Sequence, residues 1–202
     1  MKLIRNHGEV VLSEMPELER PKNISGLIGF NFRLGEIEAA IAREQLKKLA
    51  RLTARRSEIA QSLFTKLKTF PGIKMPRIDT GNTHVFYMFP IVLTGKALIL
   101  GRDRVCKTLE NNGLFEVEQG YENLHLLPIY ERGNAYGESD IPWGLDEYFK
   151  PNNYEKGSCP VAEEYKERSL FLLPLCVYEL SDADVWKVLE IFENTWRELD
   201  LF

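Results

Sequence analysis

Three histidines are the side chains of this sequence best suited to acid–base chemistry near neutral pH. His7 stands in a polar stretch, His84 begins an apolar stretch, and His125 lies in the run LHLLP. A single histidine is more often a hydrogen-bonded structural residue than a catalyst, and this plainer interpretation fits His7 and His84. Their positions in the chain alone do not give them a catalytic role.

Two pairs of carboxylates are the other candidates for proton transfer: Glu116 with Glu118, and Asp146 with Glu147. Such pairs do acid–base work only when a pocket brings them together. The sequence contains no glycine-rich phosphate loop, no HExxH, no paired CxxC and no GxSxG elbow. Residue chemistry by itself therefore identifies no reaction, and we predict neither a catalytic residue nor a metal site within this chain.

A run of basic residues follows residue 42 at spacings that place it on the outer face of a helix. Its members are Arg43, Lys47, Lys48, Arg51, Arg55 and Arg56. One interpretation is a phosphate-binding surface. The plainer one is a solvated helix face whose charge is tempered by Glu44 and Glu58, which is what such runs usually are.

Bulk properties narrow the class of protein. The chain has 202 residues and a net charge of −4, so it lacks the positive field that recruits nucleic acid or an anionic membrane. Its apolar stretches are strand-length and too short to span a bilayer, and the N-terminus has no secretory signal pattern. Three cysteines, an odd and widely spaced set, argue against a disulfide framework and indicate a reducing cytoplasm.

The elements that must position any site alternate along the chain. Residues 4–28 are polar and contain two prolines, so we interpret them as a connector. Helical periodicity begins after Leu34, first in a short stripe (Ile37, Ala40 and Ile41) and then in a longer helix that stops before the Pro71-Gly72 breaker. We predict strands at 72–76, 84–93, 114–117 and 170–173, helices at 102–112, from Pro160, and from the Ser181 cap onward, and a long loop at 133–153.

Strands interleaved with helices after a long bridging segment predict an α/β fold with an α+β small domain. We place the boundaries at 1–30 (connector and remnant of a larger domain), 31–70 (bridging helices) and 71–202 (small α/β domain). The apolar stripe of the bridging region is expected to bury against a larger domain or a partner subunit.

One segment narrows the function. Residues 29–41 (GFNFRLGEIEAAI), followed by Gln45-Leu46 and Leu49, closely resemble a hallmark of the DegT/DnrJ/EryC1/StrS aminotransferases. Three collinear stretches agree with the same family. They are LIRNHG at 3–8, HLLPIY at 125–130, and YEKGSCPVAE at 154–163 followed by LLPL at 172–175.

The resemblance implies the C-terminal small domain of a fold-type-I enzyme that depends on pyridoxal 5′-phosphate (PLP), with a remnant of the large domain. In this family the lysine that forms the Schiff base with PLP precedes the stretch similar to LIRNHG. None of the lysines here stands in a comparable motif, so we expect the chain to be truncated and inactive alone, with PLP not covalently bound. The resemblance also implies a homodimer formed through the large domain and loop 29–36, a nucleotide-linked keto-sugar substrate, and an amino acid as amine donor.

Four residues match positions to which the family gives a role. Asn31 and Arg33 match residues that reach the PLP phosphate of the partner subunit, where an amide N–H and a fixed positive charge suit a phosphate. His125 and Tyr130 match residues on the sugar side of the cleft. The plainer interpretation is that Asn31 makes a turn, Arg33 caps the following helix, and His125 and Tyr130 are structural.

Two other functions remain open at this stage. One is a regulatory or interaction protein of the same family without catalysis. The other is part of a related sugar dehydratase, in which a histidine replaces the missing lysine.

Overall fold

The computed structural model describes Arg5, residues 29–132, Tyr136 and residues 154–202. Apart from Arg5 and Tyr136, the predicted connector at 4–28 and the loop at 133–153 lie outside the described residues, and so do His7 and the Asp146/Glu147 pair. Two compact units divide the chain, Met1–Leu52 and Thr53–Phe202. The domain boundaries proposed from the sequence at residues 30 and 70 stay a prediction.

Helix α2 (Glu36–Leu67) runs through both units as one helix of 32 residues, where the sequence pattern suggested two. No glycine or proline interrupts residues 36–67, so nothing in the sequence breaks the helix. The part of α2 in the second unit buries Ile59, Ala60, Leu63 and Leu67. Ile59, Leu63 and Leu67 follow the predicted apolar periodicity, whereas Leu49, which the same periodicity predicts to be buried, is 51% exposed.

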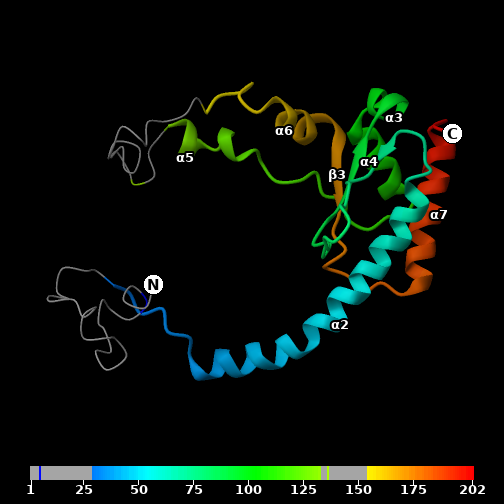
Figure 1. Cartoon of the computed structure of the whole chain (residues 1–202). Coiled ribbons are helices and arrows are strands. Elements are labelled where there is room, and N and C mark those ends of the chain that lie inside the picture. The colour runs from blue at the N-terminus through cyan, green and yellow to red at the C-terminus, as the bar shows by residue number, and fades with distance from the viewer. Residues whose placement is uncertain (1–4, 6–28, 133–135, 137–153) are drawn as a thin grey trace, which may run out of the picture. The chain divides into compact units, whose positions relative to one another are not determined.

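The second unit is built around a three-stranded antiparallel sheet in the order β1-β2-β3 (Figure 1). Strand β1 is Ile73–Lys74, β2 is Phe89–Leu93 and β3 is Leu170–Leu173. Pairing sets Ile73 opposite Leu93 and Phe89 opposite Leu173. Strand β2 alternates buried and half-buried residues, which is the pattern of a sheet with one face on a core.

The predicted strand at 84–93 is thus shorter than expected. Phe86 has a φ of +48°, a left-handed conformation that no strand residue adopts and that is strained for a bulky side chain. The Phe86 N–H donates to Nδ1 of His84 at 2.9 Å. This local bond turns the chain before β2 begins.

The predicted strand at 114–117 is wrong. The Leu114 N–H donates to the Leu109 carbonyl at 3.0 Å and the Gly113 N–H to the Glu110 carbonyl at 2.9 Å. These two bonds form the Schellman closure of the preceding helix. The chain pairs with β3 only later, through an isolated bridge between Glu118 and Leu172.

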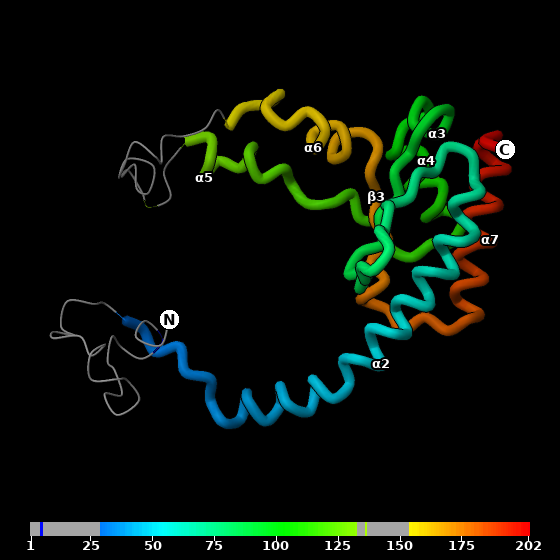
Figure 2. The backbone as a smooth tube through the Cα atoms, in the orientation of Figure 1, coloured from blue at the N-terminus to red at the C-terminus, as the bar shows by residue number. Residues whose placement is uncertain are grey.

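The remaining helices lie partly beside the sheet and partly on segments that extend away from it (Figure 2). They are α3 (Gly95–Leu100), α4 (Arg102–Asn111), the 3₁₀ turn η3 (Leu124–Leu126), α5 (Pro128–Glu131), α6 (Pro160–Glu164), the π-helical turn η5 (Tyr165–Ser169) and α7 (Asp182–Glu198). The predictions for α4, for α6 with its first-turn proline, and for β3 are confirmed. Helix α3 was not predicted, because it has six residues and begins with Gly95, a poor helix former.

Helix α7 begins as the sequence predicts. The Ser181 hydroxyl accepts from the Asp184 N–H at 3.2 Å, and the Asp184 carboxylate in turn accepts from the Ser181 N–H at 2.9 Å, which is a reciprocal capping box. Its apolar stripe (Val185, Val188, Phe192, Trp196 and Leu199) is buried as expected, Leu189 is partly buried, and Ile191 also enters the core. Arg55 of α2 pairs with Asp182 of α7 at 2.7 Å, so the two helices lie side by side.

Candidate functional site

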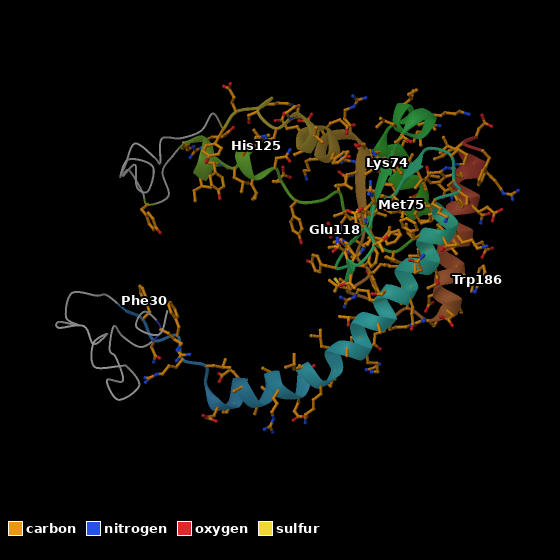
Figure 3. The ribbon with its side chains drawn as sticks, in the orientation of Figure 1. Phe30, Lys74, Met75, Glu118, His125 and Trp186 are labelled. Atoms are coloured by element: carbon orange, nitrogen blue, oxygen red, sulfur yellow. The ribbon has the colours of Figure 1, made fainter. Side chains whose placement is uncertain are left out.

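The extended segment in front of α2 carries two of the predicted site residues. Its Phe32 N–H donates to the carbonyl of Arg5 at 2.9 Å. The rings of Phe30 and Phe32 stack with centroids 5.2 Å apart and are both exposed. Asn31 and Arg33 alternate with these aromatic residues, and Figure 3 marks Phe30 within this segment.

Asn31 and Arg33 contact each other directly. The Arg33 Nε donates to the Asn31 Oδ1 at 3.2 Å, and the Arg33 backbone N–H donates to the same oxygen at 3.5 Å. The amide oxygen is therefore occupied, while the Asn31 amide N–H groups and the Arg33 terminal nitrogens meet no partner among the described residues. The two side chains present only donors and a positive charge, and this donor set fits a phosphate.

The predicted sugar-side residues lie on a second group of elements, in the C-terminal unit. His125 belongs to η3, and its Nε2 lies 2.9 Å from Oε1 of Glu163 in α6. Both side chains are nearly buried, with 11% of the His125 and 8% of the Glu163 side chain exposed. Figure 3 shows His125 on the segment that carries η3 and α5.

Tyr130, in α5 of the same segment, also contacts the segment around α6. Its ring centroid is 5.5 Å from that of Tyr154, which precedes α6. The segments 123–132 and 154–164 are thus joined at two points, and each point involves one predicted substrate residue. The structure thus places His125 and Tyr130 on one segment, 123–132, which contacts the segment 154–164 through both residues.

Glu163 is the residue that sequence reasoning missed. Besides His125, its carboxylate accepts from the Gly157 N–H at 2.9 Å and from the Cys159 N–H at 3.1 Å. The hydrogen bond with His125 is the largest cause that lowers the pKa of Glu163 below its ordinary 4.5, with the two backbone N–H groups adding to it against the opposing effect of burial. Glu163 stands in the family-like run PVAE, four residues after Cys159. Its position in this motif was the feature of the sequence that could have marked it as a candidate.

Among the other candidates, His84 and Glu118 take part in local contacts of the fold. His84 Nδ1 serves as the acceptor that turns the chain at Phe86. Glu118 pairs through its backbone with Leu172. No group of three or more potential metal ligands gathers among the described residues.

The basic face of α2 is consistent with the solvated interpretation. Arg43 and Lys47 pair with Glu44. Arg55 pairs with Asp182 and Glu58, and the hydrogen bond to Asp182 is the main cause that raises its pKa. A helix that could cross a bilayer is not found in the part of the chain that the structure describes.

Comparison with known proteins identifies the family. The model of the DegT/DnrJ/EryC1/StrS aminotransferase family matches residues 1–146. The chain belongs to this family. The resemblance inferred from the motifs is thereby confirmed.

Curated relatives match over part of their length. The GDP-perosamine synthase of Caulobacter vibrioides is 30% identical over 105 residues, which are 52% of this chain and 28% of the relative. The spore coat polysaccharide biosynthesis protein SpsC of Bacillus subtilis is 23% identical over 120 residues, which are 59% of this chain and 31% of the relative. The chain thus spans about a third or less of these two relatives.

Solved structures show the same fold. DesV of S. venezuelae, solved in complex with a ketimine intermediate, covers 96% of this chain with a TM-score of 0.65 at 23% identity, and the match takes up 43% of DesV. The 3-amino-5-hydroxybenzoic acid synthase covers 98% with a TM-score of 0.64 at 19% identity, and the match takes up 46% of that chain. The fold expected from the resemblance, that of a fold-type-I PLP-dependent aminotransferase, is confirmed.

Proposed function

We propose that this chain acts as the C-terminal part of a PLP-dependent aminotransferase that transfers an amino group to a nucleotide-linked keto-sugar. The observation that carries the proposal is the Asn31–Arg33 pair, because a family member without catalysis has no need of an intact phosphate-binding donor set. The names of the relatives, a GDP-perosamine synthase and a spore coat polysaccharide protein, support a role in amino-sugar or cell-surface polysaccharide synthesis.

Each predicted site residue has a defined task in this proposal. Asn31 and Arg33 hold the phosphate of PLP, and the loop at 29–36 carries them to the cofactor of a partner subunit in a homodimer. When bound, PLP supplies the electron sink for transfer of the amino group. His125 and Tyr130 face the sugar. The lysine that binds PLP covalently is not assigned within this chain, so the chain alone is proposed to be inactive.

The cheapest test is to read the genomic sequence immediately upstream. A lysine motif in frame supports aminotransfer. A histidine in its place supports a dehydratase, and the absence of coding sequence there supports a regulatory protein.

The functional test uses Arg33→Ala in the complete enzyme. A charge-assisted hydrogen bond contributes roughly 1.5–3 kcal/mol, so the variant should hold PLP about 10- to 150-fold less tightly. Asn31→Ala removes a neutral donor and should cost about 0.5–1.5 kcal/mol. PLP affinity is measured by equilibrium dialysis, with Arg43→Ala as the control arginine, because Arg43 is exposed and pairs only weakly with Glu44 at 3.6 Å.

Mixing subunits tests whether the loop serves the partner. Arg33→Ala subunits are combined with subunits that lack the PLP-binding lysine. If the loop acts across the dimer, each mixed dimer holds one site with both defects and one intact site, and activity partly returns. Confirmed heterodimers without recovered activity would contradict the proposal that Arg33 acts across the dimer.

A further inference from the structure

The contact between His125 and Glu163 indicates which nitrogen of the imidazole carries a proton. Glu163 is a nearly buried carboxylate whose lowered pKa keeps it ionised, so it accepts every hydrogen bond that it makes. The His125 Nε2, 2.9 Å from Oε1, must therefore be the nitrogen that carries the proton. In the neutral imidazole, Nδ1 is then the ring position that can accept a hydrogen bond.

The carboxylate does not need His125 to satisfy its own hydrogen bonding. Two backbone N–H groups, from Gly157 and Cys159, already donate to it. They also hold it in place at the start of α6, where the φ of +97° at Gly157 permits the turn. A fixed carboxylate that takes a third donor from a ring orients that ring.

The second nitrogen of the ring is available. Nδ1 of His125 meets no hydrogen-bond partner in residues 29–132 and 154–202, and 11% of the side chain stays exposed. An imidazole in this state offers one acceptor of fixed direction and no second donor. The chemical complement of such an acceptor is a hydroxyl group that donates, as on a hexose ring.

We propose that Glu163 is a positioning residue that orients His125, so that Nδ1 accepts a hydrogen bond from a hydroxyl of the sugar substrate. The proposal rests on the proposed function for its substrate class. It assigns Glu163 a role through His125 and no contact with the sugar. The two ring nitrogens of His125 then have different roles. Nε2 donates to Glu163 within the fold, and Nδ1 accepts from the ligand.

The two nitrogens can be tested separately by matched substitutions. The amide of glutamine at position 125 reaches about as far as Nε2, and the amide of asparagine lies about where Nδ1 lies. His125→Gln should keep the bond to Glu163 and the thermal stability but lose the sugar contact. His125→Asn should keep the sugar contact and lose the bond to Glu163.

Binding is measured on the chain itself by ligand-observed NMR. The probes are dTDP-glucose, dTDP and glucose, so that a contact with the hexose is distinguished from one with the nucleotide. We expect dTDP-glucose to bind His125→Gln about tenfold more weakly than the unsubstituted chain, and His125→Asn within about threefold. Binding of dTDP alone should be equal in all three.

A spectroscopic readout addresses Glu163 without any ligand. Nitrogen-15 NMR of the neutral ring should show His125 as a single tautomer with the proton on Nε2. Glu163→Leu should release the ring to both tautomers, and Glu163→Gln, whose amide oxygen can still accept from Nε2, should restore the single tautomer.

Three results would overturn the proposal. They are a proton on Nδ1 in the unsubstituted chain, sugar binding that is kept by His125→Gln and lost by His125→Asn, or no binding of dTDP-glucose to the unsubstituted chain. The histidine substitutions decide the question even if Glu163→Leu does not fold. If the predicted pattern holds but the complete enzyme transfers no amino group, the proposed function fails and the assigned contact stands.

Discussion

Replacing the indole of Trp196 by the smaller ring of phenylalanine tests what holds the C-terminal unit together. Trp196 is fully buried, its Nε1–H donates to the Pro71 carbonyl at 2.8 Å, and its ring lies 5.7 Å from those of Phe192 and Phe70. This side chain therefore joins α7 to the turn between α2 and β1. Loss of this contact should therefore lower the unfolding free energy of the C-terminal unit.

The magnitude follows from two terms. A net hydrogen bond contributes about 1 kcal/mol. Trp196→Phe also removes three heavy atoms from the core, at about 0.8 kcal/mol for each methylene-sized group and with partial relaxation around the void, which gives about 1–2 kcal/mol. We expect the variant to lose about 2–3 kcal/mol of unfolding free energy.

The assay is urea denaturation followed by far-ultraviolet circular dichroism, since tryptophan fluorescence itself changes in the variant. Trp186→Phe is the matched control, because Trp186 lies on the same helix with 65% of its surface exposed. Its substitution should change stability by no more than about 0.5 kcal/mol. A loss below about 0.5 kcal/mol for Trp196→Phe, or equal losses for both variants, would refute the reasoning.

Three further outcomes are expected. Ser181→Ala should lower the unfolding free energy by about 1 kcal/mol in the same urea assay, because it removes the cap of α7, and a change near zero would show that the cap contributes nothing. The ionised form of Glu163 stabilises the fold, since its pKa is lowered from 4.5; its contribution is present above that pH and lost as the pH falls through the lower folded value. The stability deficit of Glu163→Gln should therefore shrink as the pH falls below 4.5, and a deficit independent of pH would contradict the assignment. Burial raises the pKa of the Cys106 thiol to about 12, so mass spectrometry should find iodoacetamide on the exposed Cys159 and not on Cys106 in the native chain, and modification of both at equal rates would contradict this.

Much of the scaffold was predictable because its signals are local. The cap at Ser181, the first-turn proline of α6 and the apolar strand at 170–173 each depend on residues within one or two turns of one another. The motif at 29–41 likewise identified the family before any contact was known. The amino-acid order alone therefore determined the family, the fold class and most helix and strand positions.

Only the tertiary structure shows where residues with a local preference for β-strands adopt another conformation. Phe86 belongs to a β-prone run but adopts a left-handed conformation, because His84 accepts its N–H and the ring packs into the core. Leu114 belongs to another such run, yet its N–H closes α4 and is lost to any strand. In both places one specific hydrogen bond outweighs a weak intrinsic β-preference.

The arrangement around Glu163 shows the same division at the candidate site. The sequence placed His125 and Glu163 in separate motifs 38 residues apart, and neither motif indicates that they meet. Only the folded chain brings the imidazole of η3 to the buried carboxylate of α6, and we infer from this contact that Nε2 carries the proton. Residue types and short spacings thus determined which chemical groups the chain contains. The long-range packing determined their partners, because burial and the direction of a hydrogen bond are set only once the two segments are in contact.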